Sequence, residues 1–146
     1  VSGPFLDRID IGVEVPRQDL GMMAAEKSID EGSFPQTEQR NSSAVMRARV
    51  MEARARQEKR FADESISYNS QMTRRQIEEY CRLSGEDAVF LEKVERQQGI
   101  SARGHGKILK VARTLADLDG QAEIGRTQLA EAIGFRSFEK KYWGSL

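Results

Sequence analysis

The sequence predicts a mainly α-helical domain preceded by a single β-strand. Serine and threonine residues stand in capping positions ahead of apolar residues at helical spacing, repeatedly from Ser42 to Ile133. Near the N-terminus a single stretch alternates apolar and polar residues, and no second convincing strand follows it. Hydrophobic residues make up 38% and charged residues 32% of the 146 residues, a balance typical of exposed amphipathic helices rather than β-sandwiches.

The predicted strand covers residues 9–15, which read IDIGVEV, and Pro16 ends the alternation. A lone strand has no partner for its backbone N–H and C=O groups. We therefore expect residues 1–16 to be the last part of a sheet, and the chain to be a piece of a longer protein. Residues 17–41 show no periodicity and contain Pro35, so they are predicted to form a linker.

A strong helix is predicted over residues 44–62, capped by Ser42 and Ser43. One narrow stripe of this helix is expected to face the core, with arginines around the rest. The stripe consists of Met46, Val50, Ala53, Gln57 and Phe61.

Four further helix boundaries follow from capping residues and glycines. Thr73 and Gln76 form a capping box ahead of a short helix whose core face is Ile77, Tyr80 and Cys81. The next helix is capped by Ser84 and ends near Gly99, and the one after it is capped by Ser101 and ends near Gly120. A last helix is predicted over residues 127–133. The core face of the Ser84 helix is predicted to be Ala88, Leu91 and Val94. We expect one helical domain over residues 42–136 and a tail over 137–146.

Charge and composition exclude several classes of protein. The net charge is zero, but residues 1–40 carry eight acidic and four basic side chains, and residues 41–60 carry two and six. A uniformly basic nucleic-acid-binding surface is therefore excluded, although the 44–62 helix is basic. One cysteine and one histidine exclude a disulfide scaffold and a zinc finger, and we interpret Cys81 and His105 as structural. No metal site, phosphate-binding loop or membrane span is expected, and the location is predicted to be cytoplasmic.

Two arginines are candidates for phosphate recognition. Arg8 precedes the predicted strand, where a guanidinium can project into a neighbouring subunit and stabilise a transferring phosphoryl group. Arg103 lies in the first turn of the Ser101 helix, where its donors can reach phosphate oxygens beside the positive helix end. The alternative for each is a surface arginine paired with a nearby carboxylate such as Asp10 or Glu95.

Four stretches of the chain carry a resemblance to a known family. Residues 2–16 resemble the motif SGPLLDRIDLHVEVP, residues 42–50 resemble SSAEVRARV, residues 101–118 resemble SARAYHRILRVARTIADL, and residues 129–133 resemble the end of HLAEAL. These motifs are those of the magnesium-chelatase-like AAA+ ATPases of the ComM/YifB type, and the similarity runs from Ser2 to about Arg136. The chain differs from the family at Gly104-His105-Gly106, where the family has an aromatic residue and a basic residue.

The resemblance implies a helical AAA+ lid (a sensor-2 bundle) preceded by one strand of the ATPase core. It implies that Arg8 is an arginine finger acting in trans on the neighbouring protomer, and that Arg103 is the sensor-2 contact to ATP. Arg113 is the weaker candidate for a nucleotide contact. ATP and Mg²⁺ would be bound by the full-length protein, a homohexamer, and not by this chain alone, which we expect to be inactive as an ATPase.

The partners implied are the chain's own AAA+ core and, for the whole protein, DNA during branch migration in transformation. A chelatase ATPase subunit is the alternative within the family. A separate alternative is a helix-turn-helix-like DNA-binding module. It is suggested by the sequence pattern of residues 127–135 and by basic residues such as Arg47 and Arg54. A third is a lid that only mediates subunit contacts.

Overall fold

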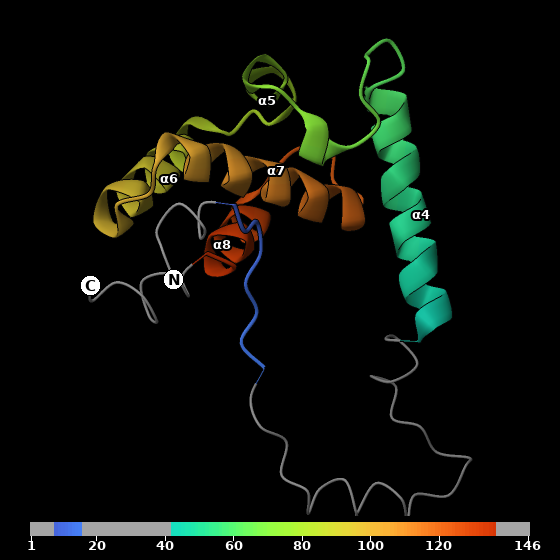
Figure 1. Ribbon diagram of the computed structural model, residues 1–146, viewed down its shortest axis with the longest axis horizontal. Coiled ribbons are helices and arrows are strands. Elements are labelled where there is room, and N and C mark those ends of the chain that lie inside the picture. The colour runs from blue at the N-terminus through green and yellow to red at the C-terminus, as the bar shows by residue number, and fades with distance from the viewer. Residues whose placement is uncertain (1–7, 16–41, 137–146) are drawn as a thin grey trace, which may run out of the picture.

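The computed structural model describes residues 8–15 and 42–136, and all helices of these ranges lie in residues 42–136 (Figure 1). The prediction of a mainly α-helical fold is confirmed. The elements in chain order are α4 (Ser43–Arg60), the 3₁₀ turn η1 (Asn69–Gln71), α5 (Arg74–Tyr80), α6 (Gly85–Gln98), α7 (Ala102–Leu118) and α8 (Arg126–Gly134). Among these helices none is long and apolar enough to cross a membrane.

Helix α7 is the centre of the domain, because α4, α5, η1 and α8 all pack against it (Figure 1). Ile108, Ala112 and Ala116 follow one another at four-residue spacing on α7, and all three are completely buried. Helix α8 contributes Leu129 to the same core, and α6 contributes Leu91. Burial of each of the larger apolar side chains stabilises the fold by about 1.5–3 kcal/mol.

The predicted helix starts are confirmed by the capping hydrogen bonds. The Oγ atoms of Ser84 and Ser101 each accept from a backbone N–H three residues later, at 3.1 Å in both cases. Thr73 and Gln76 form the expected capping box, and Ser42 caps α4. Gly99 ends α6 in the left-handed region with a φ of 68°, which a glycine adopts without strain.

The predicted strand over residues 9–15 is wrong, since the structure has no strand in its described residues. The segment instead lies against the end of α8, where Gly12 N–H donates to the Phe135 carbonyl at 3.0 Å and Arg136 Nη1 donates to the Ile9 carbonyl at 3.0 Å. No second strand is available among the described residues, and the Gly12 N–H and the Ile9 carbonyl instead find partners just after α8 and on α7. Ile9 is half-buried, and the other apolar residues of the alternation remain exposed: Ile11, Val13 and Val15.

The predicted core faces of α4 and α6 are correct only in part. Ala53, Gln57 and Phe61 are buried as expected, but Met46 and Val50 are exposed because the first half of α4 extends beyond α7 (Figure 1). On α6, Leu91 is buried while Ala88 is exposed. The buried neighbour of Ala88 is Asp87, a carboxylate that pairs with Arg126 of α8, and Val94 packs against the core as predicted.

The two glycines in the first turns of α7 differ in their surroundings. A Cβ atom on Gly104 would lie 2.7 Å from Cγ2 of Ile100, a stiff β-branched side chain. A Cβ atom on Gly106 would lie 3.4 Å from Cδ1 of Ile77, the flexible end of a side chain. Gly104 is therefore required by close packing at the junction between α6 and α7, whereas Gly106 is not.

We expect Gly104→Ala and Gly106→Ala to change stability in opposite directions. Overpacking against Ile100 should outweigh the gain in helix propensity and lower the free energy of unfolding of Gly104→Ala by about 1–2 kcal/mol. Gly106→Ala should raise it by up to about 1 kcal/mol. Urea unfolding followed by circular dichroism measures both, and stabilisation by Gly104→Ala would show that Ile100 can move aside.

Candidate functional site

The start of α7 presents Arg103 to solvent. Ser101 caps the helix through its bond from the Gly104 N–H, and this cap places Arg103 in the first turn, where its side chain is exposed. The unpaired N–H groups of a first helical turn attract anions, and an arginine beside them adds charged donors. The geometry thus provides what the sequence predicted for Arg103, an accessible guanidinium at a positive helix end.

Arg103 lines an open cavity of about 670 Å³ between α5 and the first half of α7. Cations outnumber acids on its wall, and apolar side chains form part of its lining. The cationic residues are Arg74, Arg103, Lys107 and Lys110; the acidic ones are Glu78 and Glu95; the apolar ones include Met72, Ile77, Ile100 and Leu109. Such a lining suits an anion with an apolar or aromatic part.

His105 is fixed by a carboxylate on the neighbouring helix. Its Nδ1 lies 2.6 Å from Glu95 Oε1, which joins the last turn of α6 to the first turn of α7. Both residues line the cavity beside Arg103. The contact supports the interpretation of His105 as a structural residue.

Lys107, one turn after Arg103, holds the segment that carries Arg8. Its Nζ lies 2.8 Å from Asp10 Oδ1 and donates to the Ile9 carbonyl at 3.3 Å. Arg8 itself is exposed. The structure therefore does not bring Arg8 and Arg103 into contact, but it attaches both to the same helix.

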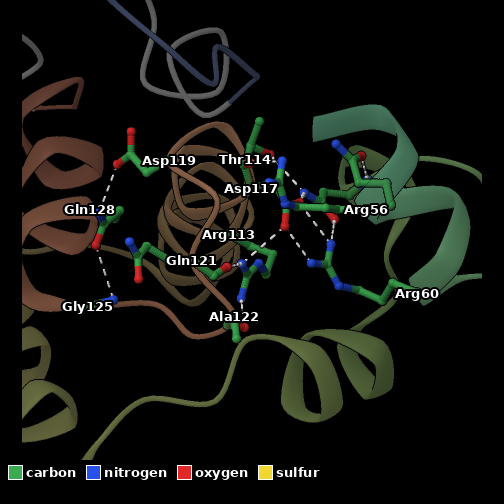
Figure 2. Close-up of polar contacts among 12 residues, drawn as sticks. Arg56, Arg60, Arg113, Thr114, Asp117, Asp119, Gln121, Ala122, Gly125 and Gln128 are labelled. Atoms are coloured by element: carbon green, nitrogen blue, oxygen red, sulfur yellow. Dashed lines mark hydrogen bonds and ion pairs between the residues drawn. The ribbon is translucent and has the colours of Figure 1, made fainter. Parts of the chain in front are cut away.

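A buried ion cluster joins the second half of α4 to the end of α7 (Figure 2). Asp117 is completely buried and accepts from Arg60 through both carboxylate oxygens. Arg113 pairs with Asp117 at 3.0 Å, and Asn69 Nδ2 donates to it at 2.8 Å. The backbone N–H of Asn69 in turn donates to Gln57 of α4 at 2.9 Å.

The charge state of Asp117 is controlled by these partners. Burial raises the pKa of its carboxyl, but hydrogen bonds from Arg60 and Asn69 and the charge of Arg113 outweigh burial, and the pKa is lowered. The cluster therefore stabilises the fold at pH values above the ordinary pKa of an unfolded aspartate. That contribution is lost as the pH falls through the lower pKa of the folded state.

Arg113 lies inside the protein rather than at a ligand-accessible surface. Its side chain is 2% exposed, and its Nη atoms donate to the carbonyls of Ala122 and Gln121 at 2.8 and 2.7 Å. Its Nε has no hydrogen-bond partner among the described residues. This geometry favours a structural role for Arg113 over the nucleotide contact that the resemblance implied, because its terminal donors already bind the chain itself.

The two candidate DNA-binding arginines are both exposed on α4. Arg47 lies in the half of the helix that extends beyond α7, and Arg54 lies over the Tyr68 ring at 5.5 Å. The helix-turn-helix alternative would need a further helix after α8, at residues 137–146, which lie outside the described residues.

Cys81 is confirmed as a buried side chain. Burial raises the pKa of its thiol to about 11, so little thiolate is present at neutral pH. In residues 8–15 and 42–136 no three His, Cys, Asp or Glu side chains are grouped so as to hold a metal ion.

Sequence reasoning missed the residues that form the buried cluster. The pair of Arg113 and Asp117 has the i, i+4 spacing of a helical ion pair and could have been found. Arg60 and Asn69 approach Asp117 from 57 and 48 residues away along the chain, and no local pattern signals that.

Together the fold and the site define a class of protein, a small helical domain around one central helix that presents an arginine at its capped start. The chain belongs to the family of magnesium chelatase subunit ChlI C-terminal domains, whose model matches residues 40–136.

The family assignment agrees with individual relatives. The competence protein ComM of Haemophilus influenzae is 38% identical over 138 residues, which cover 94% of this chain and 24% of that protein. The YifB protein of Escherichia coli is 37% identical over 140 residues, which cover 96% of this chain and 25% of that protein. A protein of Mycobacterium bovis is 29% identical over 136 residues. The chain spans about a quarter of the length of these relatives.

Proposed function

We propose that this domain is the nucleotide-responsive lid of a Mg²⁺-ATP-dependent AAA+ motor. The motor's ATPase core would be a partner of this domain, and the whole protein would be a homohexamer. Membership of the magnesium chelatase C-terminal family supports this proposal, as does the greater length of ComM and YifB. In it, Arg103 contacts the phosphates of ATP, and Arg8 reaches the nucleotide of the neighbouring protomer.

One observation carries the proposal, namely that α7 connects both arginines. Arg103 occupies the first turn of α7, and one turn later Lys107 binds Asp10 and the Ile9 carbonyl beside Arg8. A rotation of α7 in response to phosphate at Arg103 therefore moves the attachment point of Arg8. This is the coupling of nucleotide state to subunit motion that a motor needs.

The described residues fit ATP better than they fit its metal ion. The cationic wall around Arg103 suits phosphate oxygens, and the apolar part of the cavity suits a base. Mg²⁺ prefers carboxylate and phosphate oxygens in octahedral geometry, and no suitable cluster of carboxylates is found among the described residues. In the proposal the ATPase core supplies the metal ligands, and Mg²⁺ neutralises charge on the transferred phosphoryl group.

For the whole protein we propose action on DNA in the cytoplasm, as branch migration during transformation. The support is the similarity to a protein named competence protein ComM. A chelatase ATPase subunit is the second candidate, and the family description favours it. The two candidates are distinguished by measuring ATP turnover of the purified full-length protein with branched DNA or with a porphyrin acceptor added. Only the true client should stimulate the turnover.

The lid assignment is tested by Arg103→Ala in the full-length protein. Loss of one charged donor to the phosphates should lower kcat for ATP by about 100-fold. The matched control is Arg96→Ala on α6, an exposed arginine whose partner is Glu92 at 2.6 Å, and it should leave kcat unchanged. The 146-residue chain alone should show no ATP turnover. An unchanged kcat in Arg103→Ala would contradict the assignment.

A further inference from the structure

The first half of α4 continues an apolar seam that its second half already uses. Met46, Val50, Ala53 and Gln57 follow one another at spacings of four, three and four residues, the seam of a coiled-coil helix. Ala53 and Gln57 are buried at 3% and 6% exposure, whereas Met46 and Val50 are 51% and 45% exposed. Figure 1 shows this first half extending past α7. The seam is therefore occupied over half of its length.

Arginines flank the seam on both sides. In heptad terms Met46 and Ala53 are d positions, Val50 and Gln57 are a positions, and the four e and g positions between them are all arginine. The e positions are Arg47 and Arg54, and the g positions are Arg49 and Arg56. A helix with uniformly basic flanks repels a copy of itself across the same seam and pairs best with acidic flanks.

The occupied half shows how this surface recognises a partner. At the end of α7, the carboxylate of Asp119 lies 3.7 Å from Arg49, and Arg56 donates to the Asp117 carbonyl at 3.2 Å. The buried Asp117 carboxylate pairs with Arg60 of α4. An acidic helix end thus meets one basic flank of α4, next to the buried part of the seam.

The opposite flank has no such partner among the described residues. Arg47 and Arg54 are exposed, and no ion pair joins either of them to another described residue. Between this flank and the other lie the exposed side chains of Met46 and Val50. A purely electrostatic partner such as a DNA backbone would leave those apolar side chains facing phosphates.

We propose that the first half of α4 binds an acidic amphipathic α-helix of another polypeptide chain. Apolar side chains of the partner cover Met46 and Val50, and its Glu or Asp residues pair with Arg47 and Arg54. The like charge of the two arginine flanks excludes a second copy of α4 in the same seam. The inference concerns a face of the domain remote from the Arg103 cavity and is independent of ATP.

The experiment measures binding of a synthetic helix to the 146-residue chain. The probe is a fluorescent 21-residue peptide with Leu at a and d positions and Glu at e and g, and its binding is followed by anisotropy. Val50→Glu places a carboxylate in the seam and should weaken binding at least about tenfold, as should the double charge reversal Arg47→Glu/Arg54→Glu. The control is Met51→Glu, because Met51 is 57% exposed on the same helix but lies outside the seam.

Several outcomes would overturn the proposal. If a peptide with Lys at e and g bound as tightly as the Glu peptide, charge would not select the partner. If Met51→Glu weakened binding as much as Val50→Glu, the peptide would not bind along the seam. If sedimentation showed a dimer of this chain that Val50→Glu dissociates, the partner of the seam would be a second copy of the chain and not an acidic helix. If duplex DNA displaced the peptide from Arg47 and Arg54, the partner of this face would be nucleic acid. Circular dichroism of each variant confirms that these exposed substitutions leave the fold intact.

Discussion

Replacement of Asp117 by alanine should lower the free energy of unfolding by about 3–5 kcal/mol, because it leaves a buried arginine charge without its carboxylate. Arg113 has no route to solvent at 2% exposure, and Arg60 is only 15% exposed. The substitution also removes one of the two acceptors of Asn69 Nδ2 and leaves only Thr114 to join this amide to α7. Urea unfolding at pH 7, followed by circular dichroism, measures the loss.

The matched control for Asp117→Ala is Asp119→Ala, two residues further along. Asp119 also faces an arginine of α4, but its side chain is 42% exposed and the pair with Arg49 is 3.7 Å long. The Oδ2 atom of Asp119 accepts a hydrogen bond from Gln128 Nε2 at 2.8 Å. Exposed pairs of this kind contribute at most about 1 kcal/mol. If both variants lost the same stability, the buried cluster would contribute no more than a surface ion pair and one hydrogen bond from Gln128, and α4 would be held mainly by Ala53 and Phe61.

Arg8→Ala should lower ATP turnover of the full-length protein by about 10³–10⁵-fold, if Arg8 stabilises the transferring phosphoryl group of the neighbouring protomer. The expectation rests on the proposed function and on the exposure of Arg8 beside the Lys107 attachment. Steady-state ATP hydrolysis by the assembled protein measures the effect. Arg75→Ala on α5 is the control, because Arg75 is an exposed arginine away from the cavity lining.

A mixing experiment separates action in trans from a local defect. Subunits with Arg8→Ala are mixed with subunits whose proposed ATPase core carries a substitution that prevents ATP binding. Each kind is inactive alone, and a mixed ring pairs an intact ATP site with an intact Arg8 from its neighbour. Recovery of part of the turnover is expected. Absence of recovery, with mixed rings shown to form, would contradict the role in trans.

The helices could be predicted from the sequence because their signals are local. Ser84 and Ser101 each bond a backbone group three residues away, so a short stretch of sequence determines where the helix begins. The position of Arg103 in the first turn follows directly from the Ser101 cap, two residues before it. The alternation over residues 9–15 misled because a strand also needs a neighbour, and this segment binds Phe135 and Lys107 instead.

The buried cluster could not be predicted because its geometry depends on the angle between α4 and α7. Arg60 reaches Asp117 only where the two helices cross, and Asn69 reaches it from a connecting turn. The exposure of Met46 and Val50 has the same origin. Their spacing matches that of Ala53 and Gln57, and the place where α4 crosses the end of α7 decides which part of the seam is covered.

The one-sided attachment of α4 makes it a lever. Its buried contacts with α7 lie in the second half, from Ala53 to Arg60, and only an exposed pair of Arg49 with Asp119 comes before them. The ten residues before Ala53 place Ser43 about 15 Å from this pivot. A tilt of about 10° at the pivot moves the free end by about 2.6 Å over that length. Force applied to the free half is thus delivered to Asp117 and α7, and a small rotation of α7 is amplified at Met46.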